Sequence, residues 1–191
     1  MEHRANILVT EVFDTELIGE GAISTFNHAH ENLLTQDCHV VPTSGTIYAQ
    51  IVSSELCSRW NQLHDIDQIV IPEEIRGSGA SSLALHDLQL NQMTQMKGHF
   101  EPLSEPIAIF NFDFSKSNRE PIPYNRQSAN EFNLLRKDKN ADAIFMWWDL
   151  RMDPNETIVL SCAPYWCHPE KSLFDKGIKE MVSFFIYNKT Y

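Results

Sequence analysis

The stretch Ala5-Asn-Ile-Leu-Val-Thr-Glu-Val-Phe-Asp-Thr-Glu-Leu-Ile-Gly-Glu-Gly21 decides how the rest of the chain is interpreted. Its apolar, largely β-branched run Ile7, Leu8 and Val9 predicts a short buried strand of the kind found in parallel sheets. Glu11 follows that run almost directly, and open α/β sheets place their ligands at the carboxyl ends of such strands. The loop that begins at Glu11 is therefore the candidate functional site.

This loop is unusually acidic for its length. Its four acidic residues are Glu11, Asp14, Glu16 and Glu20. Gly19 and Gly21 bracket the last of them and permit tight backbone conformations, while the partly apolar middle of the loop can fold inward. The segment is thus expected to form a hairpin with an acid near each end. Two carboxylates brought together favour a cation between them, and a planar guanidinium matches them best. The alternative is a solvated acidic turn.

The composition is that of a folded, acidic protein. With 191 residues, of which 42% are hydrophobic, the chain can form one domain with a real core. Its formal charge is −11 and its pI about 5.1, so it repels phosphates and is not expected to bind nucleic acid directly. Basic peptides would be attracted, although solubility alone explains the same charge in many proteins.

Neither a membrane nor a metal is expected. No signal-like region follows Met1, and no apolar run approaches membrane-spanning length. His28 and His30 would point to different faces of a helix, and the group Cys162, Cys167 and His168 has no second pair of ligands. The cysteines lack the spacing of a disulfide scaffold and fit reduced thiols, which predicts the cytoplasm or the nucleus.

After the acidic loop the pattern is mainly β. Strands are expected at residues 46–52, 106–114, 142–152, 157–162 and 181–187, with another around 85–90. A turn at 153–156 makes a long hairpin of two of them, and a polar connection covers 115–140. A short helix, capped by Ser24 or Thr25, is expected at 25–34, with helical pieces near 60–63 and a connector at 37–45. Such strands predict a barrel or a sandwich.

The hairpin also carries two adjacent tryptophans, Trp147 and Trp148. Because side chains alternate along a strand, they are expected on opposite faces. One would lie in the core, and the other would pack on a further part of the protein or on a partner.

The segment from Glu11 to Glu20 resembles the double-E loop of the protein arginine methyltransferases, most closely that of the type III, monomethylating branch. The sequence Trp147-Trp-Asp-Leu-Arg-Met-Asp-Pro-Asn155, followed by Ala163-Pro-Tyr-Trp166, resembles the β-barrel signature of the same family. The resemblance covers nearly the whole chain. It implies a mainly β fold with short helices: the last strands of a methyltransferase α/β half, residues 1–23, and then a β-barrel substrate-binding domain, residues 24–191, with an arm-like insertion near 53–72.

The resemblance also implies an activity. This is transfer of a methyl group from S-adenosylmethionine to a guanidino nitrogen of protein arginine, giving monomethylarginine in basic substrates such as histones. Glu11 and Glu20 would be the catalytic pair, which holds the guanidinium in line with the methyl group and stabilises the moving positive charge. Asp14 and Glu16 would form an acidic, substrate-binding mouth, unless they are only a solvated loop face. Pairing with a second methyltransferase module, as a dimer or pseudo-dimer, is implied as well.

The chain departs from the family pattern in two ways. A nucleotide-binding half with a Gly-rich turn is expected before the first strand, and it has no room here. Gly77-Ser-Gly79 follows no strand and is interpreted as a loop. By register, Gly177 and Ile178 replace the His-Trp pair that lines the arginine pocket. We therefore expect a fragment, a mispredicted start or a truncated product, inactive by itself.

Two alternatives remain open from the sequence. The chain could be a truncated or degenerate relative that serves as a non-catalytic interaction or dimerisation module. It could also be an unrelated β-barrel binding domain, but the loop spacing and the Trp-Trp-Asp hairpin count against that.

Overall fold

The computed structural model describes residues 3–60, 65, 67–76, 95–115, 120–169, 171–172 and 185–188, and the structural statements below concern these residues. The strands are β1 (Ala5–Val9), β2 (Leu34–Val41), β3 (Ser44–Ser53), β4 (Glu101–Pro102), β5 (Ile107–Asp113), β6 (Ala143–Arg151), β7 (Ile158–Ser161) and β8 (Phe185–Asn188). The helices are α1 (Ala22–Asn32), α2 (Glu55–Trp60) and α3 (Glu73–Arg76). Within the described part, no helix is long and apolar enough to cross a membrane.

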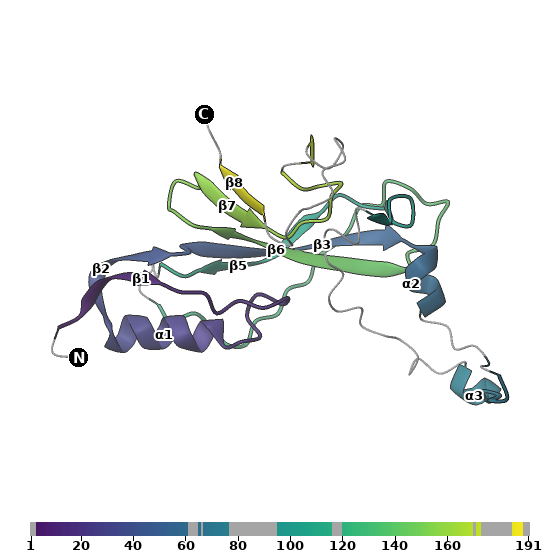
Figure 1. Cartoon of the computed structure of the whole chain (residues 1–191), viewed down its shortest axis with the longest axis horizontal. Helices are drawn as coiled ribbons and strands as arrows, with labels where there is room; N and C mark the ends of the chain where they lie inside the picture. Colours follow the sequence, from purple (N-terminus) through teal and green to yellow (C-terminus); the bar gives the residue numbers. More distant parts are fainter. Residues whose placement is uncertain are drawn as a thin grey trace.

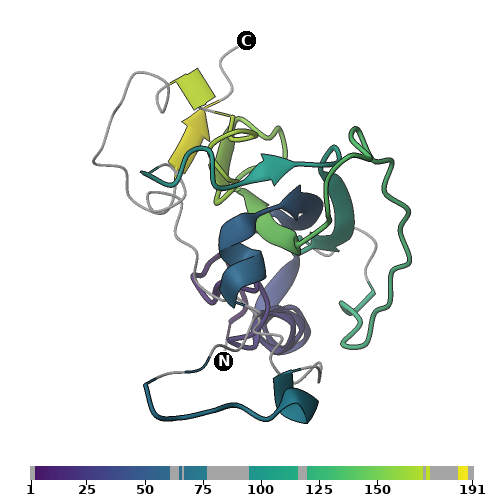
Figure 2. The same cartoon turned by 90° about the vertical axis from the view of Figure 1, so that its right-hand side faces the viewer.

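The strands form two sheets that follow one another along the molecule (Figure 1). β1 and β2 make a small parallel sheet, and the acidic loop and α1 form the connection between them. The second sheet has the order β4-β3-β6-β7-β8, with β5 also paired to β3, and it curls into a half-barrel (Figure 2). The expected mainly β fold with short helices is confirmed. The division at residue 23 stays a prediction; the first sheet ends at Val41 and the second begins at Ser44.

β1 is the predicted parallel strand, but the prediction that it is buried is wrong. Ile7 is 58% exposed and Val9 is 73% exposed, while Leu8 packs against the core. Side chains alternate between the two faces of a strand, and β2 is the only strand paired with β1 among the described residues. One face of β1 therefore lies on the core and the other is left uncovered by the described residues.

The helix after the acidic loop begins earlier than predicted. α1 starts at Ala22 with Gly21 as its N-cap in the left-handed conformation (φ 84°), and no side chain caps it. The predicted cap at Ser24 or Thr25 is therefore wrong: the Ser24 hydroxyl donates to the Gly21 carbonyl at 2.8 Å. Glycine adopts this conformation without a steric penalty, so the helix can start directly at the end of the loop.

The predicted connector at residues 37–45 is also wrong, because most of it lies in the strands β2 and β3. β2 turns Leu34 and Val40 into the core and leaves polar residues such as Asp37 and His39 exposed. With so few apolar positions, its sequence gives only a weak strand signal.

The predicted strands at 46–52, 106–114, 142–152 and 157–162 are confirmed as β3, β5, β6 and β7. The last predicted strand, 181–187, is described only from Phe185 onward, as β8. The helical piece predicted at 60–63 is described only at Trp60, the last residue of α2. The rest of that piece, the predicted strand at 85–90, the Gly77–Gly79 loop and the Gly177-Ile178 pair lie outside the described residues.

β6 supplies side chains to two hydrophobic clusters. Trp148 and Leu150 belong to a cluster shared with α1 and the acidic loop, whereas Phe145 and Trp147 belong to a second one near α2. The two tryptophans thus lie in different clusters, as alternation requires. The prediction that one of them packs outside this chain is wrong: both are buried here, and Trp147 stacks on Tyr48 with ring centroids 5.9 Å apart.

The long polar connection before β6 loops out beside the second sheet (Figure 2), and hydrogen bonds attach it to the rest of the fold. The Asn27 side chain of α1 donates to the Ile122 carbonyl at 2.9 Å and accepts from the Ile122 N–H at 2.8 Å. Further along, the Leu135 N–H donates to the Leu103 carbonyl at 2.8 Å. Just after the predicted arm region, residues 53–72, α3 lies apart from both sheets in both views (Figures 1 and 2).

Candidate functional site

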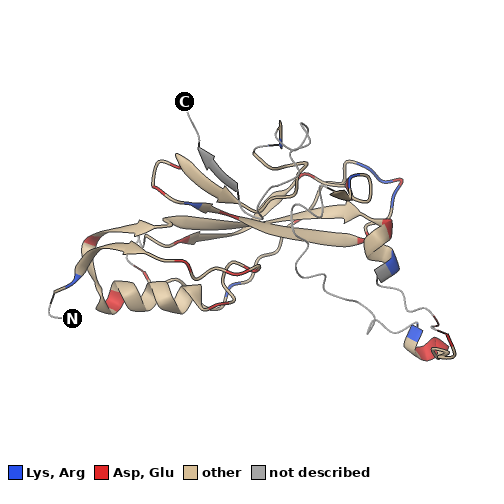
Figure 3. Ribbon diagram, viewed as in Figure 1, with Lys and Arg blue, Asp and Glu red and all other residues tan. Residues whose placement is uncertain are grey.

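The acidic loop, residues 10–21, runs from the end of β1 to the start of α1 and lies against the second sheet. Acidic positions recur along this coil (Figure 3). Glu11, Glu16 and Glu20 are exposed, and Asp14 is half-buried. The loop therefore presents carboxylates to solvent, while its apolar residues face the core.

Asp14 organises the turn of the loop. Its Oδ1 atom accepts the backbone N–H groups of Glu16 at 3.0 Å and Gly19 at 3.1 Å. A Cβ atom at position 19 would lie 1.9 Å from the Asp14 Oδ2 atom, so a side chain there would force that carboxylate to move. This local role was not predicted, although an aspartate that bonds backbone groups just after it is a common turn signal.

Leu17 anchors the middle of the loop in the core, as the inward fold of that apolar middle predicted. Its side chain is fully buried, and its backbone has a left-handed φ of 72°. It packs over Gly45 of β3, where a Cβ atom would come within 3.1 Å of the Leu17 Cδ2 atom. Phe13 adds ring contacts with Phe26 and Phe114, at centroid distances of 6.1 and 5.5 Å.

One directed polar contact ties the loop to the second sheet. The indole Nε1–H of Trp148, on β6, donates to the backbone carbonyl of Asp14 at 2.9 Å. The same carbonyl accepts the Leu17 N–H at 3.0 Å, which closes the turn. Sequence reasoning missed this contact, because the two residues are 134 positions apart.

The two residues predicted as the catalytic pair flank this anchored turn. Glu11 comes just after Thr10, whose N–H donates to the Val41 carbonyl at 3.1 Å and prolongs the β1–β2 pairing. Glu20 immediately precedes Gly21, the N-cap of α1. Within the described part of the chain, neither glutamate side chain forms a hydrogen bond or an ion pair, with the other or with any residue. Both carboxylates are therefore free to bind a ligand.

The histidines and cysteines that were considered as metal ligands make other contacts in the structure. The His30 Nε2 atom lies 2.7 Å from the Phe114 carbonyl, and His28 contacts Asn32. Burial raises the pKa of the Cys162 and Cys167 thiols to about 12, so both are protonated at neutral pH and are poor ligands. Among the residues described, no three or more His, Cys, Asp and Glu side chains gather as a metal site.

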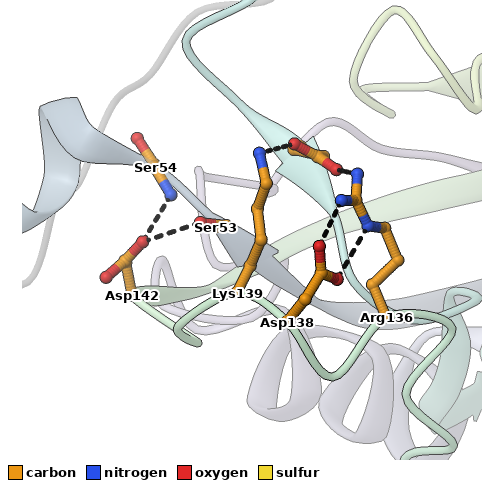
Figure 4. A network of polar contacts seen from close by, with 7 residues as sticks. Ser53, Ser54, Arg136, Asp138, Lys139 and Asp142 are labelled. Carbon is orange, nitrogen blue, oxygen red and sulfur yellow. Dashed lines mark hydrogen bonds and ion pairs between the residues drawn. The ribbon is translucent and has the colours of Figure 1, made fainter.

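A second polar region lies near α2, at the far end of the sheet (Figure 4). An open hollow of about 340 Å³ there is lined in part by Ser53, Lys139 and Asp142. Asp142 accepts the Ser54 N–H at 2.7 Å, and Glu101 is bound by Arg136 and Lys139, which lowers its pKa through the Lys139 hydrogen bond first. Asp142 and Lys139, which line the hollow, therefore already have partners, whereas Glu11 and Glu20 of the acidic loop have none among the described residues.

Comparison with known proteins gives one consistent result. Residues 43–174 match the family model described as the arginine methyltransferase oligomerization subdomain. The chain is 45% identical over 178 residues to protein arginine N-methyltransferase 7 of Aedes aegypti, covering 89% of this chain and 25% of that protein. It is 41% identical over 185 residues to the protein of the same name in Drosophila virilis, and that match covers 94% of this chain and 26% of that protein. The chain thus spans about a quarter of the length of these relatives.

A solved structure has a similar fold. It is the Trypanosoma brucei PRMT1 enzyme-prozyme heterotetrameric complex with AdoHcy, with a TM-score of 0.53 at 14% identity. The match covers 86% of this chain and 49% of that chain. At this level of identity the likeness concerns the arrangement of elements, and it supports a half-barrel that follows a short α/β segment.

Proposed function

This chain belongs to the protein arginine methyltransferase family, and from that premise we propose that its acidic loop holds the guanidinium of a protein arginine during methyl transfer. One observation carries the proposal: Glu11 and Glu20 are exposed carboxylates without partners among the described residues, at the two ends of a turn anchored to the sheet. A guanidinium is the cation whose planar set of N–H donors suits two such acceptors.

The carboxylates would act in three ways. They would hold the guanidinium plane in one orientation, which lowers the entropy that the reaction must lose. They would draw its positive charge toward themselves and leave the attacking nitrogen richer in electrons. They would also offset the charge that remains on the methylated product. The guanidinium needs such help because its pKa exceeds about 12 and its lone pairs are delocalised.

The methyl donor would be S-adenosylmethionine. The described residues do not fit a nucleotide site, because β1 is followed by the acidic loop and not by a Gly-rich turn. When bound, this cofactor supplies an activated methyl group, and we propose that residues outside this sequence hold it. This chain would contribute the residues of the active site that bind the substrate arginine.

Substrate choice would follow from charge. Glu16 is exposed and would attract basic residues that flank the target arginine, as in histone-like sequences. The Oδ1 atom of Asp14 already accepts two hydrogen bonds within the turn, so a basic substrate residue would bind the Oδ2 atom. We propose monomethylarginine as the product, the outcome that the resemblance of the segment Glu11 to Glu20 to the type III branch implies.

The test is a chimeric enzyme in which this chain replaces the matching 178 residues of the Aedes aegypti relative. Transfer of labelled methyl groups to a basic arginine peptide is measured, and the product is identified by mass spectrometry. Glu11→Gln should reduce the rate about 30- to 1,000-fold, since the lost charge interaction is worth roughly 2–4 kcal/mol.

The matched control is Glu31→Gln, which changes an exposed acid on α1. It should leave the rate within about threefold of the parent. Equal activity of Glu11→Gln and Glu31→Gln would show that the loop carboxylates do not carry the reaction.

A second role is supported by the match to an oligomerization subdomain. In it, the chain pairs with another methyltransferase module as a dimer or pseudo-dimer and contributes no catalysis. An inactive chimera that still assembles like the unmodified relative, as measured by sedimentation velocity, would favour this role.

A further inference from the structure

We infer that Trp148 is a positioning residue for the acidic loop: its indole N–H holds the Asp14 carbonyl and so fixes where Glu11 and Glu20 stand. The inference rests on the proposed function of that loop. It adds a residue from the half-barrel to a site whose acidic residues come from the segment before it. The half-barrel would then fix the conformation of the acidic loop directly.

Trp148 is well placed for this task. It is 3% exposed, it lies on the central pair of strands, and it sits directly opposite Ile47 of β3. Its ring is therefore fixed by the sheet, and its Nε1–H reaches the loop at 2.9 Å with the length of a normal hydrogen bond. A rigid donor on a sheet positions its acceptor more closely than a donor on a loop does.

The other anchors of the loop are less specific. Leu17 and Phe13 pack by apolar contact, which is non-directional and tolerates small shifts. The Asp14 carboxylate bonds only to backbone groups of the loop itself, so it shapes the turn without fixing it to the sheet. The bond from Trp148, in contrast, is a directed contact between the turn and the second sheet.

The backbone of the turn is strained and needs a contact that keeps it in place. Leu17 has a left-handed φ of 72°, a conformation that is strained for a non-glycine residue and persists only where the surroundings enforce it. The carbonyl that Trp148 binds is also the acceptor of the Leu17 N–H. Losing the indole donor should therefore loosen the turn at its strained residue.

The test compares Trp148→Phe with Trp147→Phe. Both changes replace a buried tryptophan of β6 by a smaller aromatic ring, but only the first removes a bond to the loop. Hydrogen–deuterium exchange of the 191-residue chain reports on the loop without any need for activity. Trp148→Phe should speed exchange at residues 12–21 at least about tenfold, and Trp147→Phe should leave it within about twofold.

In the chimeric enzyme, Trp148→Phe should lower kcat about tenfold or more. The KM for S-adenosylmethionine should stay the same, because the loop is proposed to hold arginine and not the cofactor. Glu20→Gln is assayed in parallel. If Glu20→Gln is inactive while Trp148→Phe changes neither loop exchange nor kcat beyond Trp147→Phe, the positioning role is refuted and the proposed function stands. If Glu20→Gln is fully active, the proposed function fails, and loop exchange alone decides the role of Trp148.

A second variant covers the case in which Trp148→Phe does not fold. Gly19 lies on the exposed side of the loop. The change Gly19→Ala would force the Asp14 carboxylate to move, because the new Cβ atom would meet the Asp14 Oδ2 atom. In a ¹H–¹⁵N spectrum of the chain, the Trp148 indole resonance should shift and that of Trp147 should not. An unchanged Trp148 resonance would contradict the link between the indole and the turn.

Discussion

Replacing Asp14 by alanine should destabilise the acidic loop by an amount that the structure allows us to estimate. The carboxylate accepts two backbone N–H groups through one oxygen, at 3.0 and 3.1 Å. A hydrogen bond to a charged group contributes about 1.5–3 kcal/mol when buried, but both N–H groups lie in exposed residues and can bind water after the change. The expected loss is therefore about 1–2 kcal/mol in the free energy of unfolding.

The change Asp14→Asn tests whether the turn needs the negative charge of Asp14 or only its side-chain oxygen as an acceptor. Asparagine keeps a side-chain oxygen that can accept the same N–H groups, so its loss should stay below about 1 kcal/mol. In the chimeric enzyme it should mainly weaken the binding of peptides with a second nearby arginine, because the proposed role of Asp14 is at the mouth of the site.

The assay is urea unfolding of the chain followed by tryptophan fluorescence, with Glu31→Ala as the exposed control. Both Asp14 variants and the control should unfold in one transition with similar m values. If Asp14→Ala is as stable as Glu31→Ala, the turn does not depend on the carboxylate, and Asp14 does not organise the loop.

Three further predictions concern the rest of the fold. Asn27→Ala removes both bonds to Ile122 and should cost about 1–3 kcal/mol of unfolding free energy. Asn27→Asp keeps the acceptor for the Ile122 N–H but sets a carboxylate oxygen against the Ile122 carbonyl, so it should cost at least as much; urea unfolding measures both. Burial lowers the pKa of His168 to about 4, below the ordinary 6.5 of the unfolded chain, so the unfolded chain takes up the proton first as the pH falls. Stability should therefore fall between pH 6.5 and 4, by about 1–2 kcal/mol at pH 5, and the difference between the parent and His168→Gln across that range isolates this effect. Ile144 and Met146 are 61% and 59% exposed on one face of β6, so the chain should self-associate in sedimentation velocity runs, and Ile144→Lys should shift it toward monomer; a monomeric parent chain would contradict this.

Local patterns predicted much of the fold. The alternation of apolar residues located β3, β5, β6 and β7, and the run Ile7, Leu8 and Val9 indicated a strand of a parallel sheet. The paired acids and the apolar middle of the loop indicated a turn with its centre folded inward, and the buried Leu17 confirms this. These features depend on residues close together in the sequence, which is why the sequence reveals them.

Other features depend on contacts that no local pattern records. The exposure of Ile7 and Val9 depends on which strands lie beside β1, and the bond between Trp148 and Asp14 depends on how the second sheet meets the loop. The start of α1 at Ala22 depends on the left-handed conformation of Gly21, which competed with the more familiar Ser or Thr cap. In each case tertiary packing or backbone geometry outweighed the local preference.

The central claim is that Glu20 and Glu11 hold a guanidinium through their charge. Single-turnover methyl transfer by the chimeric enzyme, at saturating peptide and S-adenosylmethionine, tests it most directly by comparing Glu20→Gln with Glu31→Gln. Glutamine keeps the size of glutamate and one acceptor but loses the anion, so Glu20→Gln should slow the step about 30- to 1,000-fold while the thermal melting temperature stays unchanged. A single-turnover rate for Glu20→Gln equal to that of Glu31→Gln would contradict the claim and leave the acids as a solvated turn.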